Sequence, residues 1–197
     1  LPREFKLFTG KDGQVYMSAN VVPEVAALRR NYKRLPDLLV ANERDAKNVS
    51  TSKENAFEIE MDVTLNKASK TGIVLYNDKG EKVDIYFDIK AGRLVMDRTE
   101  SGKVKFGEKS EPHKIETDYD DRQEQKALGA KRKLNSINYQ NDFALGTWAP
   151  LSLCNSDTYH LDIFVDKCSV EIFVDGGRIS MTNLVFPTAP YTDRKSV

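Results

Sequence analysis

Apolar and polar residues alternate along much of the chain. In the clearest stretch, apolar residues at 57, 59, 61, 63 and 65 are separated by polar ones, which places the apolar side chains on one face of a strand. The same period of two predicts strands at 83–89, 159–165, 170–174 and 179–185. A short apolar run at 72–76 predicts one more.

Turn-forming residues separate these segments. The cluster at 77–80 predicts a turn, and Asp175-Gly176-Gly177 contains the Asp-Gly pair typical of a tight hairpin. We therefore expect a meander over 57–89, with strand 57–65 beside strand 72–76, and hairpins over 159–185. A further hairpin is predicted for residues 4–8 and 14–21, and a short helix for residues 23–30, which begin with Pro23.

Many short strands with one apolar and one polar face predict an all-β fold, an antiparallel two-sheet β-sandwich with at most one or two short helices. The 197 residues are expected to form one domain, 1–197. Residues 107–142 have few apolar side chains, so they are predicted to be a long insertion or partly ordered loop with a helical turn near 122–134.

Charge and cysteine content exclude several kinds of partner. Thirty basic residues balance thirty acidic ones, which disfavours nucleic acid, and the longest apolar runs are too short for a membrane span. A predicted strand about 20 Å long separates Cys154 from Cys168, so a disulfide is not expected. The spacing of His113, Cys154, His160 and Cys168 does not fit a zinc site, and neither a metal nor a cofactor is predicted.

Three carboxylates form the sharpest catalytic candidate. Glu58, Glu60 and Asp62 lie at alternate positions of one predicted strand, so successive members are about 7 Å apart, a spacing that glycosidases use. The same pattern is also that of any strand with one solvated face. His160 and Asp162 suggest part of a Ser-His-Asp triad, but there is no Gly-x-Ser-x-Gly motif to present a nucleophile, and His160 is expected to be a packed or surface imidazole.

The single tryptophan has two interpretations. Trp148, with Tyr139 and Phe143 nearby in sequence, predicts either an aromatic platform for a sugar ring or a residue of the sandwich core.

One late segment resembles a known family. It is the run Leu161-Asp162-Ile163-Phe164-Val165-Asp166-Lys167-Cys168-Ser169-Val170-Glu171-Ile172-Phe173-Val174-Asp175-Gly176-Gly177, continuing to Phe186-Pro187. This run resembles the late hairpin in the C-terminal β-sandwich of glycoside hydrolase family 32, the invertase, levanase and inulinase family. Shorter stretches at 1–4, 57–59, 97–102 and 143–151 resemble other parts of that module in the same order.

The resemblance implies a non-catalytic C-terminal module of a fructan- or sucrose-hydrolysing enzyme, packed against an N-terminal propeller catalytic domain of the same polypeptide. The family's catalytic motifs on the propeller resemble Asn-Asp-Pro-Asn-Gly, Arg-Asp-Pro and Glu-Cys, and none of them occurs here, so no residue of this chain inherits a catalytic role. The resemblance also implies a secreted or periplasmic location. Family members usually add a final strand after the segment matching Phe186-Pro187. The sequence leaves open whether that strand is missing here, and its absence would leave a sheet edge open.

Two other functions stay open at this stage. One is a carbohydrate-binding module for fructan that uses Trp148 or Tyr139. The other is a free-standing β-sandwich glycosidase that uses Glu58 and Glu60.

Overall fold

A computed structural model describes residues 1–40, 48–50, 56–65, 68–105, 143–154 and 157–196. The predicted insertion at 107–142, its helical turn and the candidate Tyr139 lie outside the described residues. Among the residues described, no helix has the length and apolarity to cross a membrane.

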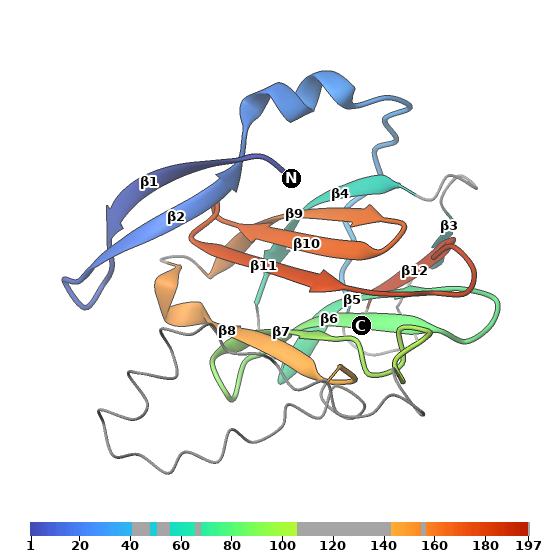
Figure 1. The fold of residues 1–197 in the computed structure, drawn as a ribbon. Helices are drawn as coiled ribbons and strands as arrows, with labels where there is room; N and C mark the ends of the chain where they lie inside the picture. Colours follow the sequence, from blue (N-terminus) through green and yellow to red (C-terminus); the bar gives the residue numbers. More distant parts are fainter. Residues whose placement is uncertain (41–47, 51–55, 66–67, 106–142, 155–156, 197) are drawn as a thin grey trace, which may run out of the picture.

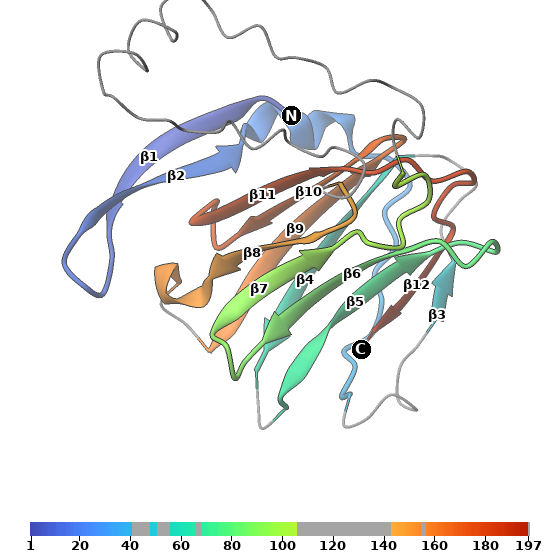
Figure 2. The same cartoon turned by 60° about the horizontal axis from the view of Figure 1, so that its bottom comes forward.

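Two antiparallel sheets face each other (Figures 1 and 2). The four-stranded sheet has the order β11 (Ile179–Leu184), β10 (Ser169–Val174), β9 (Thr158–Asp166), β4 (Phe57–Thr64). The six-stranded sheet has the order β3 (Asn48–Ser50), β12 (Asp193–Ser196), β5 (Lys70–Tyr76), β6 (Lys82–Asp88), β7 (Arg93–Asp97), β8 (Gly146–Pro150). The predicted two-sheet antiparallel sandwich is therefore confirmed.

The core lies between the two sheets. Alternate residues of the six-stranded sheet, such as Leu75 and Ile85, and of the four-stranded sheet, such as Ile163 and Ile172, are almost completely buried. Because side chains alternate along a strand, the residues between these positions lie on the outer faces of the sandwich.

A separate hairpin precedes the sandwich. Strands β1 (Arg3–Thr9) and β2 (Val15–Val21) pair with each other and form their own two-stranded sheet. The predicted short helix follows as the 3₁₀ helix η1 (Pro23–Leu28), and η3 (Leu151–Leu153) is another short 3₁₀ turn. Figure 1 shows the hairpin extending beyond the edge of the sandwich, with η1 above β4.

The predicted meander is wrong at its first strand. Strand β4 pairs with β9 along its whole length, from Phe57 opposite Val165 to Thr64 opposite Thr158, whereas β5 pairs with β6 in the other sheet. The chain changes sheets between β4 and β5, because the apolar faces of both strands reach the same core from opposite sides.

The structure answers the open question of a final strand. Strand β12 follows the Phe186-Pro187 segment and pairs with β5 on one side and β3 on the other. It therefore lies inside the six-stranded sheet, and the edge of β5 is covered.

Substitutions at two adjacent glycines can test how the β1–β2 hairpin is fixed to the sandwich. Gly176 and Gly177 both have positive φ, at 66° and 77°, so alanine at either position costs about 1 to 2 kcal/mol of backbone strain. A Cβ at Gly177 would lie 2.5 Å from the backbone carbonyl carbon of Ala19 on β2, whereas a Cβ at Gly176 would meet nothing within 4 Å.

We predict that Gly177→Ala lowers the free energy of unfolding in urea by clearly more than Gly176→Ala. The difference between the two variants measures the docking of the hairpin, because the backbone penalty is common to both. Equal losses would contradict this contact, and limited proteolysis at the hairpin should be faster only in Gly177→Ala.

Candidate functional site

The three predicted carboxylates lie on the outer face of β4. The register of β4 and β9 places Glu60 opposite Asp162 and Asp62 opposite His160. Carboxylate oxygens of Glu58, Glu60 and Asp162 lie within 4.8 Å of one another. The structure therefore brings two of the three predicted residues together with Asp162, which sequence spacing did not connect to them.

An arginine pairs with two members of this acidic cluster. The Arg29 guanidinium, one residue after η1, donates to Glu58 from Nε at 2.8 Å and from a terminal nitrogen at 2.5 Å, and it lies 3.7 Å from Glu60. Bidentate pairing of this kind is the geometry that a guanidinium and a carboxylate prefer. Burial raises the pKa of Asp162, and the charges of Glu60 and Glu58 act in the same direction. The cluster therefore acts as an anchor for the segment that follows the hairpin.

His160 lies between two aspartates. Its Nδ1 is 2.8 Å from Asp62, and its Nε2 is 3.6 Å from Asp162. The hydrogen bond with Asp62 raises the pKa of His160, and nearby carboxylates add to this effect against the opposing effect of burial. His160 is a partly exposed surface imidazole that joins β4 to β9, as one of the two sequence interpretations expected.

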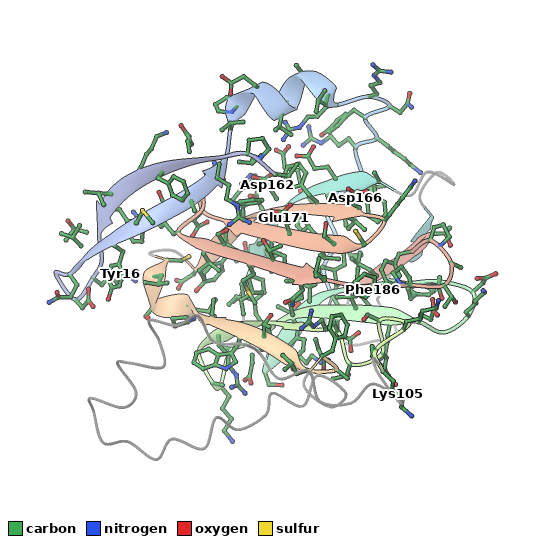
Figure 3. All side chains as sticks on the ribbon, in the orientation of Figure 1. Tyr16, Lys105, Asp162, Asp166, Glu171 and Phe186 are labelled. Atoms are coloured by element: carbon green, nitrogen blue, oxygen red, sulfur yellow. The ribbon has the colours of Figure 1, made fainter. Side chains whose placement is uncertain are left out.

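A second arginine fastens β1 to the same sheet. Arg3 donates to Glu171 at 2.8 Å, to Ser180 at 2.7 Å and to Thr182, and it lies over the Phe173 ring. Glu171 and Phe173 belong to the outer face of β10, yet they are only 7% and 1% exposed, because the N-terminal segment covers them. Figure 3 shows Asp162 and Glu171 on the side of the sheet that faces this segment.

Trp148 is a surface residue. Its side chain is 59% exposed on β8, so the prediction of a core tryptophan is wrong and the platform interpretation stays open. The Arg93 guanidinium lies 5.8 Å from the centre of its ring.

The two cysteines are unpaired: Cys154 is buried and Cys168 is exposed. Burial raises the pKa of the Cys154 thiol to about 12, which makes it a poor nucleophile.

The hairpin exposes apolar residues that sequence reasoning did not single out. Phe5, Leu7, Val15 and Met17 are between 61% and 75% exposed, and the register of β1 and β2 places them on one face. These four residues are called the hairpin apolar face below. Their alternation was visible in the sequence, but an exposed and a buried apolar strand face have the same pattern.

The family model "Glycosyl hydrolases family 32 C terminal" matches residues 24–196. The chain belongs to this family. The match confirms the resemblance based on the late hairpin, and it begins after the β1–β2 hairpin.

Solved structures of the family have the same fold. An exo-inulinase from Aspergillus awamori is similar over 100% of this chain, with a TM-score of 0.63 and 17% identity. A β-fructofuranosidase from Schwanniomyces occidentalis covers 98% of it, with a TM-score of 0.60 and 15% identity. A sucrose-6-phosphate hydrolase from Lactobacillus gasseri also covers 98%, with a TM-score of 0.55 and 18% identity. No curated protein sequence matches the chain.

This family 32 C-terminal domain spans about a third of those larger chains: 32% of the exo-inulinase, 35% of the β-fructofuranosidase and 30% of the sucrose-6-phosphate hydrolase. The structural match to the exo-inulinase includes the hairpin, because it covers the whole of this chain. The hairpin is thus a shared structural feature that lies outside the C-terminal family model.

The His160 contact makes the stability of this family 32 domain depend on pH. The folded state holds the His160 proton more tightly than the unfolded chain does, so the contact stabilises the fold below the unfolded pKa of about 6.5. This contribution is lost as pH rises through the higher pKa of the folded state. We predict that Asp62→Asn lowers the pKa of His160 in an NMR titration and removes this part of the pH dependence of unfolding.

Assignment of the NMR signal is simple, because the chain has two histidines and His160→Gln removes one of them. A His160 pKa unchanged by Asp62→Asn would show that Asp62 is not the main cause of the shift.

Proposed function

We propose that this chain is the non-catalytic C-terminal module of a fructan- or sucrose-hydrolysing enzyme and that it stabilises an N-terminal propeller catalytic domain by packing against it. The observation that carries the proposal is the hairpin apolar face. Four large apolar side chains on one face of a two-stranded sheet are typical of a surface that another part of a protein covers.

The opposite face of the hairpin already has a partner. The Arg178 guanidinium lies 4.5 Å from the centre of the Phe8 ring, and the Ala19 N–H donates to the Gly177 carbonyl at 2.9 Å. These interactions, with the Arg3 contacts at the beginning of β1, hold the hairpin on the sandwich. The hairpin apolar face is therefore available to the catalytic domain, and the hairpin links the two domains.

The names of similar structures support the type of parent enzyme. They include an exo-inulinase and two β-fructofuranosidases, and the chain spans about a third of their length. We therefore infer that the parent enzyme hydrolyses fructosyl bonds and that its catalytic carboxylates belong to the propeller. The acidic residues of the present chain have a structural role in this proposal.

The packing role predicts a stability effect that depends on the rest of the polypeptide. Leu7 and Met17 are directly opposite each other on the hairpin apolar face, and burying each side chain is worth about 1.5 to 3 kcal/mol. We predict that Leu7→Ser combined with Met17→Ser lowers the thermal unfolding midpoint of the complete enzyme by several degrees. In the separate 197-residue chain the same pair should change it little, because both side chains are already in water.

Leu184→Ser is the matched control. Leu184 is an exposed apolar residue on β11 and does not belong to the hairpin, so its replacement should be neutral in both proteins. Equal losses in the separate chain and the complete enzyme would mean that the two hairpin residues stabilise only this module, and the packing proposal would fail.

The proposal also predicts that the 197-residue chain releases no reducing sugar from sucrose, levan or inulin. Arg29 holds Glu58 through two hydrogen bonds, so this carboxylate is engaged in an ion pair. Sugar release by the purified chain that disappears in Glu58→Gln would instead support a free-standing glycosidase that uses Glu58 and Glu60.

A further inference from the structure

The outer face of the six-stranded sheet carries a row of residues centred on Trp148. Leu94 and Met96 on β7 belong to the core, so Arg93 and Val95 lie on the opposite face of that strand. Val95 is paired with Trp148 on β8 and with Tyr86 on β6. Cross-strand partners share a face, so Trp148, Val95 and Tyr86 form one row across three strands, called the aromatic row below. Figure 2 shows these three strands side by side at one end of their sheet.

The aromatic row extends across three adjacent strands. Adjacent strands are about 4.8 Å apart, so the backbones that carry Trp148 and Tyr86 are about 10 Å apart. Val95 fills the position between them and is only 7% exposed. Trp148 by contrast is 59% exposed and offers a large apolar ring to a flat ligand that lies along the row.

Charged groups border the row. Arg93 approaches the Trp148 ring and pairs with Asp88 at 3.3 Å. The Lys70 ammonium lies 3.7 Å from the centre of the Tyr86 ring. Positively charged hydrogen-bond donors and a negatively charged acceptor thus lie in the same part of the sheet, next to an exposed aromatic ring.

We propose that the aromatic row binds an uncharged oligosaccharide, with one sugar ring stacked on Trp148 and its hydroxyl groups bonded to Arg93 and Asp88. A sugar ring has an apolar face formed by C–H groups and an edge formed by hydroxyls, which matches a tryptophan ring bordered by a guanidinium and a carboxylate. This proposal is independent of the packing role, because the hairpin apolar face belongs to a different sheet.

The charges favour this ligand over two others. Asp88 already pairs with Arg93, and the Lys70 ammonium lies against the Tyr86 ring, so the row does not present the convergent cluster of cations that favours a phosphate group. A protein partner would have to remove water from Arg93 and Asp88 when it covered Trp148, which carries a desolvation cost. Sugar hydroxyls replace that water with hydrogen bonds.

The single tryptophan provides a direct test. Trp148 is the only tryptophan in the sequence, so intrinsic tryptophan fluorescence of the 197-residue chain reports on this row alone. We expect a saturable fluorescence change on titration with nystose, a fructooligosaccharide chosen because of the proposed parent enzyme, and a matching heat signal in calorimetry. A parallel titration with maltotetraose tests whether the row selects fructose over glucose units.

Variants separate stacking from hydrogen bonding. Trp148→Leu should weaken nystose binding in calorimetry at least about tenfold. Arg93→Met should weaken it several-fold while leaving the Trp148 fluorescence in place. Leu184→Ala, a change at an exposed apolar residue on β11, should leave binding unchanged, and circular dichroism of each variant checks that the sandwich is folded.

Three results would overturn the proposal. They are the absence of any saturable response to both sugars, binding that is unchanged in folded Trp148→Leu, and a fluorescence change that follows protein concentration rather than sugar concentration. The last result would identify a second protein molecule as the occupant of the row. None of them bears on the hairpin variants, so failure here is distinguishable from failure of the packing role.

Discussion

Burial of alternate residues between two facing sheets determines where chemistry is possible in this module. Leu75 and Ile85 in one sheet and Ile163 and Ile172 in the other are almost inaccessible to water, and together they fill the space between the layers. Side chains alternate along each strand, so this packing fixes every second residue on an outer face. The charged clusters, His160 and Trp148 all belong to those outer faces.

The outer face of the four-stranded sheet is covered by the chain itself. Arg3 and Arg29 place one guanidinium over Glu171 and another over Glu58 and Glu60. Without Arg3, the buried Glu171 carboxylate would lose an ion pair and a hydrogen bond, which would destabilise the folded state. Because these polar contacts fix the N-terminal segment on the sandwich, the apolar residues of its hairpin are left on the opposite side, where they face solvent in the separate chain.

Strands with regular alternation could be predicted from the sequence, but the strands with which they pair were harder to predict. The β9–β10–β11 hairpins followed from short turns, but the pairing of β4 with β9 joins residues about a hundred positions apart, and no local pattern encodes it. Strand β7 was missed because three consecutive apolar residues at 94–96 hide the period of two, and β12 because it has no apolar residue. The carboxylates of the site were visible in the sequence, whereas Arg29 and Asp162 reach them only through tertiary structure.

The two exposed apolar surfaces differ in the groups around them, and this difference assigns them different partners. The four residues of the hairpin apolar face have one another, Thr9 and Ala19 as direct cross-strand partners. Arg3 shares this face but is already paired with Glu171, so a protein surface can cover the four side chains without removing water from an unpaired charge. Trp148 lies beside the Arg93–Asp88 ion pair, and a ligand there must replace the water bound to both groups. A polyhydroxylated ligand meets that requirement and an apolar protein surface does not. We therefore propose a different partner for each surface, a catalytic domain for the hairpin and a sugar chain for the separate sheet face.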